Sequence, residues 1–196
     1  MARPREFDLG TALEQAMSVF WTKGYDGASL RDLTSAMGIT GPSLYAAFGD
    51  KRNLFLKTID HYCDVDGCAP LVAFEAETDI QAAIRSFLSE VIYSASEHAS
   101  GAKGCFLASS VATSVGQVDG VAERVEAAIV ETENRLIDRF NHEITKGTLP
   151  SDFPSSARAA LLFDLRQGYM FRGRAGWDSR RMHKDIEARV QMLLTN

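Results

Sequence analysis

The chain has 196 residues, of which 45% are hydrophobic and 24% charged, a composition typical of a globular protein with one or two domains. No apolar run approaches the roughly 18 residues that a membrane span needs, and the start MARPREFD lacks the apolar stretch of a secretory signal, so we expect a cytoplasmic protein with no membrane partner. The net charge is −5, but residues 1–60 carry seven Lys or Arg against seven Asp or Glu, which excludes recognition of a polyanion through a broad positive field there.

Helices are predicted throughout, because Pro is scarce, Ala, Leu and Glu are frequent, and no stretch alternates with a period of two. The first helix has apolar residues at i, i+4, i+7 and i+8, namely Leu13, Met17, Phe20 and Trp21. It is expected to end near Gly24. The sequence therefore predicts an all-α protein whose first helix packs behind the segment that follows.

Residues 29–51, SLRDLTSAMGITGPSLYAAFGDK, predict a helix-turn-helix with a third helix starting directly after it. Ser29 can cap the first of these helices, with Asp32 completing a capping box. Gly38 stands where the chain must leave the helix with a positive φ, and Gly49 ends the second helix. Two short helices joined by a sharp turn indicate DNA binding.

The spacing T/S-L-x-D-L-x-x-x-x-G-I-x-x-x-S-L-Y-x-x-F-x-x-K resembles the amino-terminal domain of the tetracycline-repressor-like (TetR) family over about the first 60 residues. The rest of the chain is similar only in length and helical character. The resemblance implies a three-helix DNA-binding head at 1–50, a connecting helix at 51–68, and an effector-binding and dimerisation domain at 69–196. It also implies a homodimeric repressor that binds a palindromic operator and is relieved by an unknown small molecule.

In a helix-turn-helix, the amino-terminal residues of the second helix read the bases. Here they lack Arg, Lys, Asn and Gln, so we expect phosphate contacts from hydroxyl groups and apolar contacts to thymine methyl groups. Lys51 lies in a first helical turn, where a cation opposes the helix dipole unless an anion such as a phosphate binds it; the alternative is an exposed lysine. The predicted DNA-binding residues are Arg3, Arg5, Ser29, Thr40, Gly41, Pro42, Ser43, Tyr45 and Lys51. The two arginines could reach the minor groove or belong to a solvated tail.

Beyond residue 60 the elements are less sharply marked. A connection between domains is expected at 69–77, an amphipathic helix from 79 to before 100, and a short apolar segment at 105–115. A long helix is expected from a cap at Asp119 to Gly147, then helices at 155–172 and from 179 to the end.

Two sets of residues follow from the family resemblance. The expected ligand pocket is lined by Tyr62, Phe87, Val91, Phe106, Ser109, Ile129 and Phe140, although aromatic residues at helical spacing more often form core. The expected dimer interface is a four-helix bundle of the last two helices from each subunit, with Leu161, Leu165, Tyr169, Ile186, Val190 and Leu193. An ordinary monomer core is the alternative for these six.

The sequence leaves four other functions to compare with a DNA-binding regulator. Cys105, after a glycine-rich turn, is a candidate redox-reactive thiol, and Cys63 or Cys68 with His61 or His98 is a candidate metal site. The spacing of the cysteines does not match zinc patterns, so no metal and no cofactor is predicted. No catalytic motif is present, so no catalytic residue is predicted and an enzyme is not expected. A helical interaction module that keeps the head only for packing is the last alternative.

Overall fold

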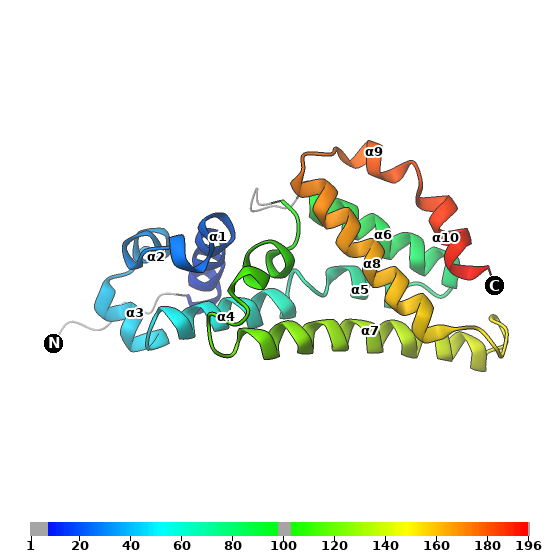
Figure 1. The fold of residues 1–196 in the computed structure, drawn as a ribbon, viewed down its shortest axis with the longest axis horizontal. Coiled ribbons are helices and arrows are strands. Elements are labelled where there is room, and N and C mark those ends of the chain that lie inside the picture. The colour runs from blue at the N-terminus through cyan, green and yellow to red at the C-terminus, as the bar shows by residue number, and fades with distance from the viewer. Residues whose placement is uncertain (1–7, 98–102, 196) are drawn as a thin grey trace. The chain divides into compact units, whose positions relative to one another are not determined.

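The structure is a computed structural model that describes residues 8–97 and 103–195 (Figure 1). Within these ranges every regular element is a helix, which confirms the predicted all-α class. None of the helices in the described ranges is both long enough and apolar enough to cross a bilayer. The chain forms two compact units, which are described in turn: unit 1 is Met1–Asp64 with Phe106–Val125, and unit 2 is Val65–Cys105 with Glu126–Asn196.

Unit 1 contains the predicted helix-turn-helix. Its helices are α1 (Leu9–Gly27), α2 (Leu30–Met37), α3 (Gly41–Phe48), α4 (Lys51–Asp64), the π-helix η1 (Leu107–Val111) and the 3-10 helix η2 (Ala112–Ser114). The first turn of α7 (Val121–Thr145) also belongs to it. Gly38 ends α2 with φ 65° and Gly49 ends α3 with φ 82°, as the sequence predicts.

The helix α1 passes through the position where its end was expected. Gly24 leaves the helix with φ 71°, so the predicted break is a kink, and helical structure resumes up to Gly27. Just before the kink, the Ser110 hydroxyl donates a hydrogen bond of 2.9 Å to the carbonyl of Trp21. A π-helix distant in sequence therefore satisfies a backbone oxygen next to the interruption in α1.

Residues 106–125 pack in unit 1, although the predicted domain boundary at 69 assigns them to the second domain. Phe106 is fully buried, and its ring centroid lies 5.5 Å from that of Trp21, 5.7 Å from that of Tyr62 and 6.3 Å from that of Phe55. Aromatic pairs at these separations stabilise a core beyond the area they bury. The predicted boundary at 69 therefore does not describe the packing, because a segment from later in the chain completes the core of the head.

Unit 2 is built from the remaining helices. They are α5 (Ala69–Ala76), α6 (Ile80–Glu97), the rest of α7, α8 (Ser155–Arg174), α9 (Ser179–His183) and α10 (Ile186–Leu194). The segment expected to connect the domains is thus the helix α5, which accommodates Pro70 because a proline in the first helical turn loses no helical hydrogen bond. The last predicted helix is divided into α9 and α10 around Lys184 and Asp185.

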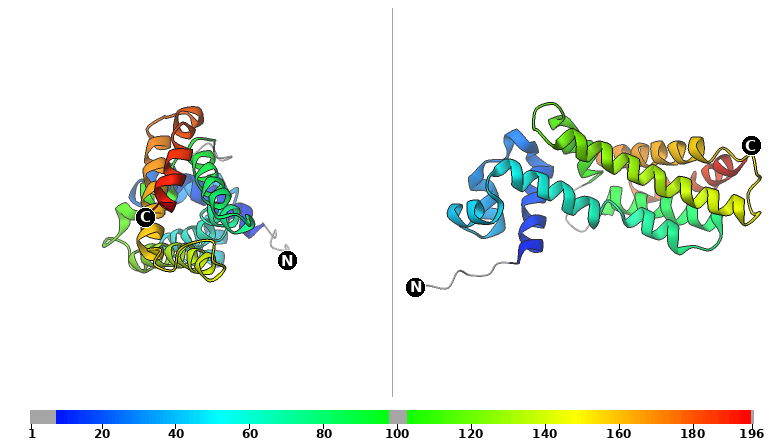
Figure 2. Two further views of the ribbon diagram at one scale, coloured as in Figure 1. Left: turned by 90° about the vertical axis from the view of Figure 1, so that its right-hand side faces the viewer. Right: turned by 90° about the horizontal axis from the view of Figure 1, so that it is seen from below.

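The core of unit 2 lies where α8 and α10 pack against α6 (Figure 2). The backbones of α6 and α8 approach closely at Gly173, where an added Cβ would lie 2.3 Å from the carbonyl oxygen of Ala95. Gly104, with φ 87°, also donates its backbone N–H to that carbonyl. Glycine is therefore required at residue 173 by the helix contact, because any side chain would overlap backbone atoms.

A buried ion pair fixes the carboxyl end of α7. The Glu143 side chain is 1% exposed and accepts hydrogen bonds from Arg139 Nε, at 2.9 Å, and from the Thr148 hydroxyl. Arg139 also donates to the carbonyls of Phe74 and Thr78, at 3.3 Å each, so the pair joins α7 to the end of α5 and the turn after it. Burial by itself raises the pKa of Glu143, but the hydrogen bonds from Thr148 and Arg139 outweigh it and the pKa is lowered.

This lowered pKa predicts a pH dependence of stability. A carboxyl group whose pKa is lower in the folded than in the unfolded protein stabilises the fold above the unfolded value, about 4.3 for Glu, and this contribution is lost as the pH falls through the folded value. The Glu143→Gln variant should therefore lose less unfolding free energy than the wild type between about pH 5 and pH 3. Urea titrations at several pH values measure it, and parallel pH profiles for the two proteins would contradict the role of Glu143.

Candidate nucleic-acid interface

The start of α2 is held by a full capping box. The Ser29 hydroxyl accepts from the Asp32 N–H at 3.1 Å, and Asp32 Oδ2 accepts from the Ser29 N–H at 3.1 Å and from the Ser29 hydroxyl at 2.8 Å. Lys23 of α1 lies 2.7 Å from the other carboxylate oxygen. Hydrogen bonds from Lys23 and Ser29 hold the pKa of Asp32 well below its usual range. Ser29, predicted as a DNA contact, is therefore engaged within the helix cap.

The start of α3 is capped by Thr40. Its hydroxyl accepts from the Ser43 N–H at 3.3 Å and lies 2.9 Å from the Ser43 hydroxyl. Pro42 falls in the first turn, where its missing N–H is not needed. The cap uses the Thr40 oxygen as an acceptor and leaves the Thr40 side chain on the exposed surface, while the Ser43 hydroxyl keeps capacity for a further hydrogen bond.

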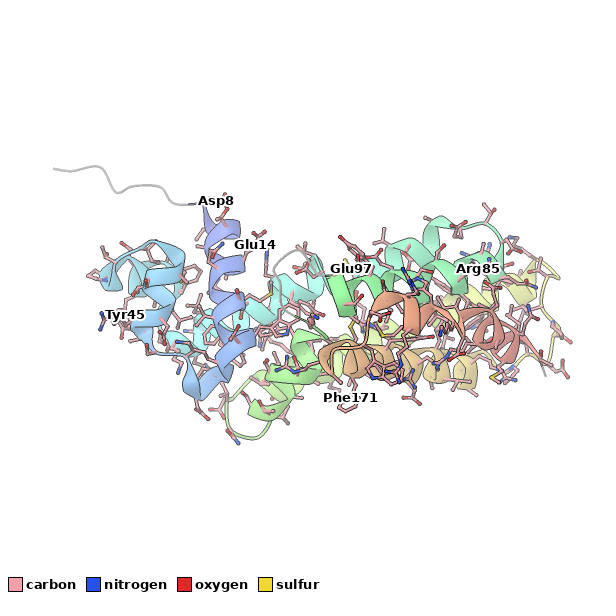
Figure 3. The ribbon with its side chains drawn as sticks, turned by 90° about the horizontal axis from the view of Figure 1, so that it is seen from above. Asp8, Glu14, Tyr45, Arg85, Glu97 and Phe171 are labelled. Carbon is pink, nitrogen blue, oxygen red and sulfur yellow. The ribbon has the colours of Figure 1, made fainter. Side chains whose placement is uncertain are left out.

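The outer face of α3 carries the predicted reading residues. Leu44 and Phe48 are buried, whereas Pro42 is exposed and Tyr45 is 52% exposed (Figure 3). Gly41 has no heavy atom within 4 Å of an added Cβ, so its lack of a side chain is not required by packing within the chain. The arrangement presents a small, nearly uncharged surface that fits a close approach to base edges.

Lys51 begins α4, and its side chain contacts Tyr25, a residue that was not among the predicted site residues. The ammonium group lies 4.5 Å from the centroid of the Tyr25 ring, in the geometry of a cation–π contact. Asp50 caps the same helix end by accepting from the Asn53 N–H at 2.7 Å. Burial is the main cause that raises the pKa of Tyr25, followed by the charge of Asp50. Tyr25 follows the kink at Gly24, so the regular helical repeat of α1 does not predict where its side chain points.

The remaining predicted DNA contacts are Arg3 and Arg5, which lie outside the described residues. Their role stays a prediction.

The predicted dimer interface needs correction for four of its six residues. In unit 2 these four are core residues exposed by 4% or less: Tyr169, Ile186, Val190 and Leu193. Their apolar stripes on α8 and α10 face other parts of the same unit, because the most apolar face of a helix is the one that packs into the core. Leu161 is 38% exposed and Leu165 is half-buried, so these two remain available to a partner.

The predicted pocket residues divide between the two units. Tyr62, Phe106 and Ser109 belong to unit 1, and Phe87, Val91, Ile129 and Phe140 belong to unit 2. Five of these seven residues are exposed by 3% or less, as expected for core residues: Tyr62, Phe87, Val91, Phe106 and Phe140. A surface hollow in unit 1 has none of the seven in its lining, which consists of Leu9, Leu13, Ala47, Phe48, Lys57, Asp60, His61 and Asp64. The ligand pocket therefore stays a prediction.

The cysteines give little support to the sensor alternatives. Cys105 is 2% exposed, so its sulfur has little access to an oxidant or electrophile, and Cys63 and Cys68 are half-buried. His98 lies outside the described residues. Over residues 8–97 and 103–195, no three His, Cys, Asp or Glu side chains gather in a group that could hold a metal ion.

The comparisons with known proteins agree with this geometry. The family profile described as "Bacterial regulatory proteins, tetR family" matches residues 12–58, which span α1 to α4. The chain is 30% identical to YezE of Bacillus subtilis strain 168, described as an uncharacterized HTH-type transcriptional regulator, over 98% of this chain and 100% of YezE. It is 27% identical to the HTH-type transcriptional repressor ComR of Escherichia coli K12, over 89% and 83% of the two chains.

Among solved structures, the chain is similar to the TetR family transcriptional regulator CifR, in a cysteine mutant complexed with 26-bp operator DNA. The TM-score is 0.86 at 29% identity, covering 96% of this chain and 98% of the CifR chain. The likeness to YezE and to CifR extends over nearly the whole chain, whereas the sequence resemblance was confined to the head. With its capped α2–α3 turn and its full-length relatives, this chain belongs to the tetR family of bacterial regulatory proteins.

Proposed function

We propose that this regulator is a cytoplasmic, homodimeric transcriptional repressor that binds a palindromic operator through α3 and is released from it by a small molecule. The observation that carries the proposal is the exposed amino-terminal face of α3, held by the Thr40 cap and by the buried Leu44 and Phe48. CifR, whose fold is similar over the whole chain, was solved with operator DNA, and ComR is named as a repressor. No catalytic role is proposed.

Sequence recognition in this proposal depends on few contacts. Tyr45 and Ser43 would bind phosphates, while Thr40 and Pro42 would contact thymine methyl groups. Because α3 offers no bidentate hydrogen-bonding side chain, part of the selectivity would come from the sequence-dependent shape of the operator. Two heads on one dimer would then be needed for useful affinity.

The dimer surface that we propose consists of the exposed apolar residues of α8 and α10, and it leaves out the four predicted interface residues that lie in the core. It consists of Leu161, Leu165 and Phe171 on α8 and Met192 on α10. Phe171 is 76% exposed and Met192 is 68% exposed, which is unusual for side chains of this size. Figure 3 labels Phe171. At 100° per residue, the three α8 residues lie within about 120° of arc, so they can face one partner.

Genome-wide pull-down of bound fragments tests the regulatory function. The purified chain should retain a small set of fragments with a shared palindromic sequence, and a gel-shift titration should show the dimer bound to each. Deleting the gene should raise transcription next to these fragments if the chain is a repressor. Uniform recovery of all genomic fragments, or none, would contradict the proposal.

Lys51 provides a sharper prediction for the phosphate contact. The Tyr25 ring holds the ammonium at the start of α4, so the cation is in place before DNA binds. Lys51→Ala should weaken binding roughly tenfold on operator and unrelated DNA alike and should reduce the salt dependence, because a phosphate contact carries no sequence information. Titrations at several salt concentrations measure both effects.

Lys57→Ala is the matched control, because Lys57 is an exposed lysine on the same helix. It should bind as the wild type does. If Lys51→Ala weakens only the operator complex, or neither complex, Lys51 does not contact a phosphate. Substitutions of Thr40 or Pro42 should instead change the preferred sequence.

A further inference from the structure

Arg166 occupies a core position of α8 in unit 2. The buried face of this helix repeats at intervals of three and four residues and is otherwise uncharged; it includes Ala159, Leu162, Tyr169, Met170 and Gly173. Arg166 falls in the same repeat and is only 5% exposed. A permanently charged side chain thus stands in an apolar stripe, where arginine is rarely found unless it is paired.

The protein supplies very little to balance this charge. Arg166 Nη2 donates to the carbonyl of Gly67 at 3.1 Å, whereas its Nε is buried and has no hydrogen-bond acceptor among the described residues. Elsewhere in unit 2, Arg85, Arg135 and Arg139 each pair with a glutamate. No described Asp or Glu pairs in this way with Arg166.

An unbalanced buried guanidinium is a costly arrangement, and no side chain in the described ranges relieves it. A buried lysine could release its proton, but arginine stays charged at any physiological pH. One neutral carbonyl uses one of five N–H donors and brings no negative charge. The arrangement becomes favourable when an anion binds, because a carboxylate supplies both the charge and a pair of parallel acceptors.

The same part of α8 carries two more buried polar atoms that lack a partner within the described chain, Gln167 Oε1 and Tyr169 OH. Buried polar atoms are nearly always hydrogen-bonded. At 100° per residue, Arg166 and Tyr169 lie about 60° apart around α8, so their two unmatched atoms on one face indicate a missing bound group, whereas Gln167 points to another side of the helix. Burial raises the pKa of Tyr169, which keeps its hydroxyl protonated and able to donate.

We propose that Arg166 binds the carboxylate of a small, mainly apolar monoanion, and that such an acid is the effector of this regulator. The site itself is inferred from Arg166 and its neighbours, whereas its regulatory role rests on the function proposed above. A monoanion matches the one guanidinium that is buried, because Arg172 and Arg189, which lie 5.6 and 4.6 Å from the centroid of the Tyr169 ring, are only half-buried. An apolar body matches the apolar face of α8. A dianion would bring a second charge into the same apolar surroundings.

Thermal unfolding of the full-length protein tests the site without DNA. The probes are benzoate and decanoate, with the uncharged benzamide and decanol as matched controls. At about 100 times the Kd, the carboxylates should raise the Tm by about 5–10 °C, and the uncharged compounds should not. The Arg166→Met variant should show no such shift. Arg166→Lys keeps the positive charge but lacks the planar guanidinium, so it should bind the carboxylates about 10- to 100-fold more weakly.

Arg135→Met is the control variant, because it removes an arginine of unit 2 that is already paired with Glu75, and it should keep the carboxylate shift. Without ligand, Arg166→Met should unfold at the wild-type Tm or above it, since an unpaired buried charge is removed. A much lower Tm for Arg166→Met would instead show that Arg166 supports the fold through Gly67 and would overturn the proposal. So would the absence of any carboxylate shift in the wild type, which would mean that water alone satisfies the site.

A DNA-release experiment, measured by fluorescence anisotropy, distinguishes the proposed carboxylate site from the proposed regulatory function. Carboxylates that release the DNA from the wild type, but not from Arg166→Met, support both the site and its regulatory role. Carboxylates that stabilise the wild type but leave the DNA complex intact support the binding site and overturn its role as effector site. A chain that binds no DNA at all overturns the proposed function, while the thermal shifts still decide whether Arg166 binds an acid.

Discussion

Phe171→Glu should convert the protein to monomers and weaken operator binding by about 100-fold or more. Phe171 is the most exposed large apolar side chain of α8, at 76%, so the substitution costs the isolated subunit little. In a dimer whose subunits meet at α8, it would place two carboxylates in an apolar contact. The DNA affinity falls because two heads on one particle gain about 10²- to 10⁴-fold over single heads.

Sedimentation velocity and a gel-shift titration measure the two effects. Val72→Glu is the matched control, because Val72 is an exposed apolar residue on α5, at 55%, outside the proposed surface. It should leave both the dimer and the DNA affinity unchanged. A Phe171→Glu protein that still sediments as a dimer would show that the subunits meet elsewhere.

Gly173→Ala should destabilise the protein by about 3 kcal/mol or more, which is a large part of the stability of an ordinary domain. The new Cβ would lie 2.3 Å from the carbonyl oxygen of Ala95 and 2.7 Å from its carbonyl carbon, so α6 and α8 must move apart. The helix propensity of alanine returns only about 1 kcal/mol. Equilibrium unfolding in urea, followed by circular dichroism, measures the difference.

Gly41→Ala is the control for that experiment, because Gly41 is also a helical glycine but has open space where the methyl group would stand. Its unfolding free energy should stay the same or rise slightly. Equal stabilities for Gly173→Ala and the wild type would mean that the helices separate without cost. The control also probes the reading face of α3, where an extra methyl group should reduce operator binding.

Much of the head could be predicted from local sequence. The capping box of Ser29 and Asp32, the positive φ of Gly38 and the end of α3 at Gly49 all appear where they were expected. These features depend on interactions within a few residues, which sequence spacing specifies directly. The predicted DNA contacts follow from the same spacing and await the binding experiments.

Helical periodicity does not distinguish the core of a subunit from a dimer interface, because both require an apolar stripe. Tyr169, Ile186, Val190 and Leu193 form true apolar stripes, but a stripe does not say whether the subunit or a partner covers it. The structure shows these four in the core and leaves Phe171 exposed. Similarly, the 69–77 segment looked like a connection because of Pro70 and its acidic residues, although a proline is compatible with the first turn of α5.

Short-range spacing along the chain is enough to predict the all-helical class, the helix-turn-helix with its caps and the resemblance to one family. Packing between distant elements brings Phe106 and Ser110 into the core of the head, places Tyr25 against Lys51, and buries Arg166 without a carboxylate. Each of these is a contact between residues on different elements. The pairing of helices depends on how all the apolar faces of the chain are buried together, and the local spacing of residues does not specify this pairing.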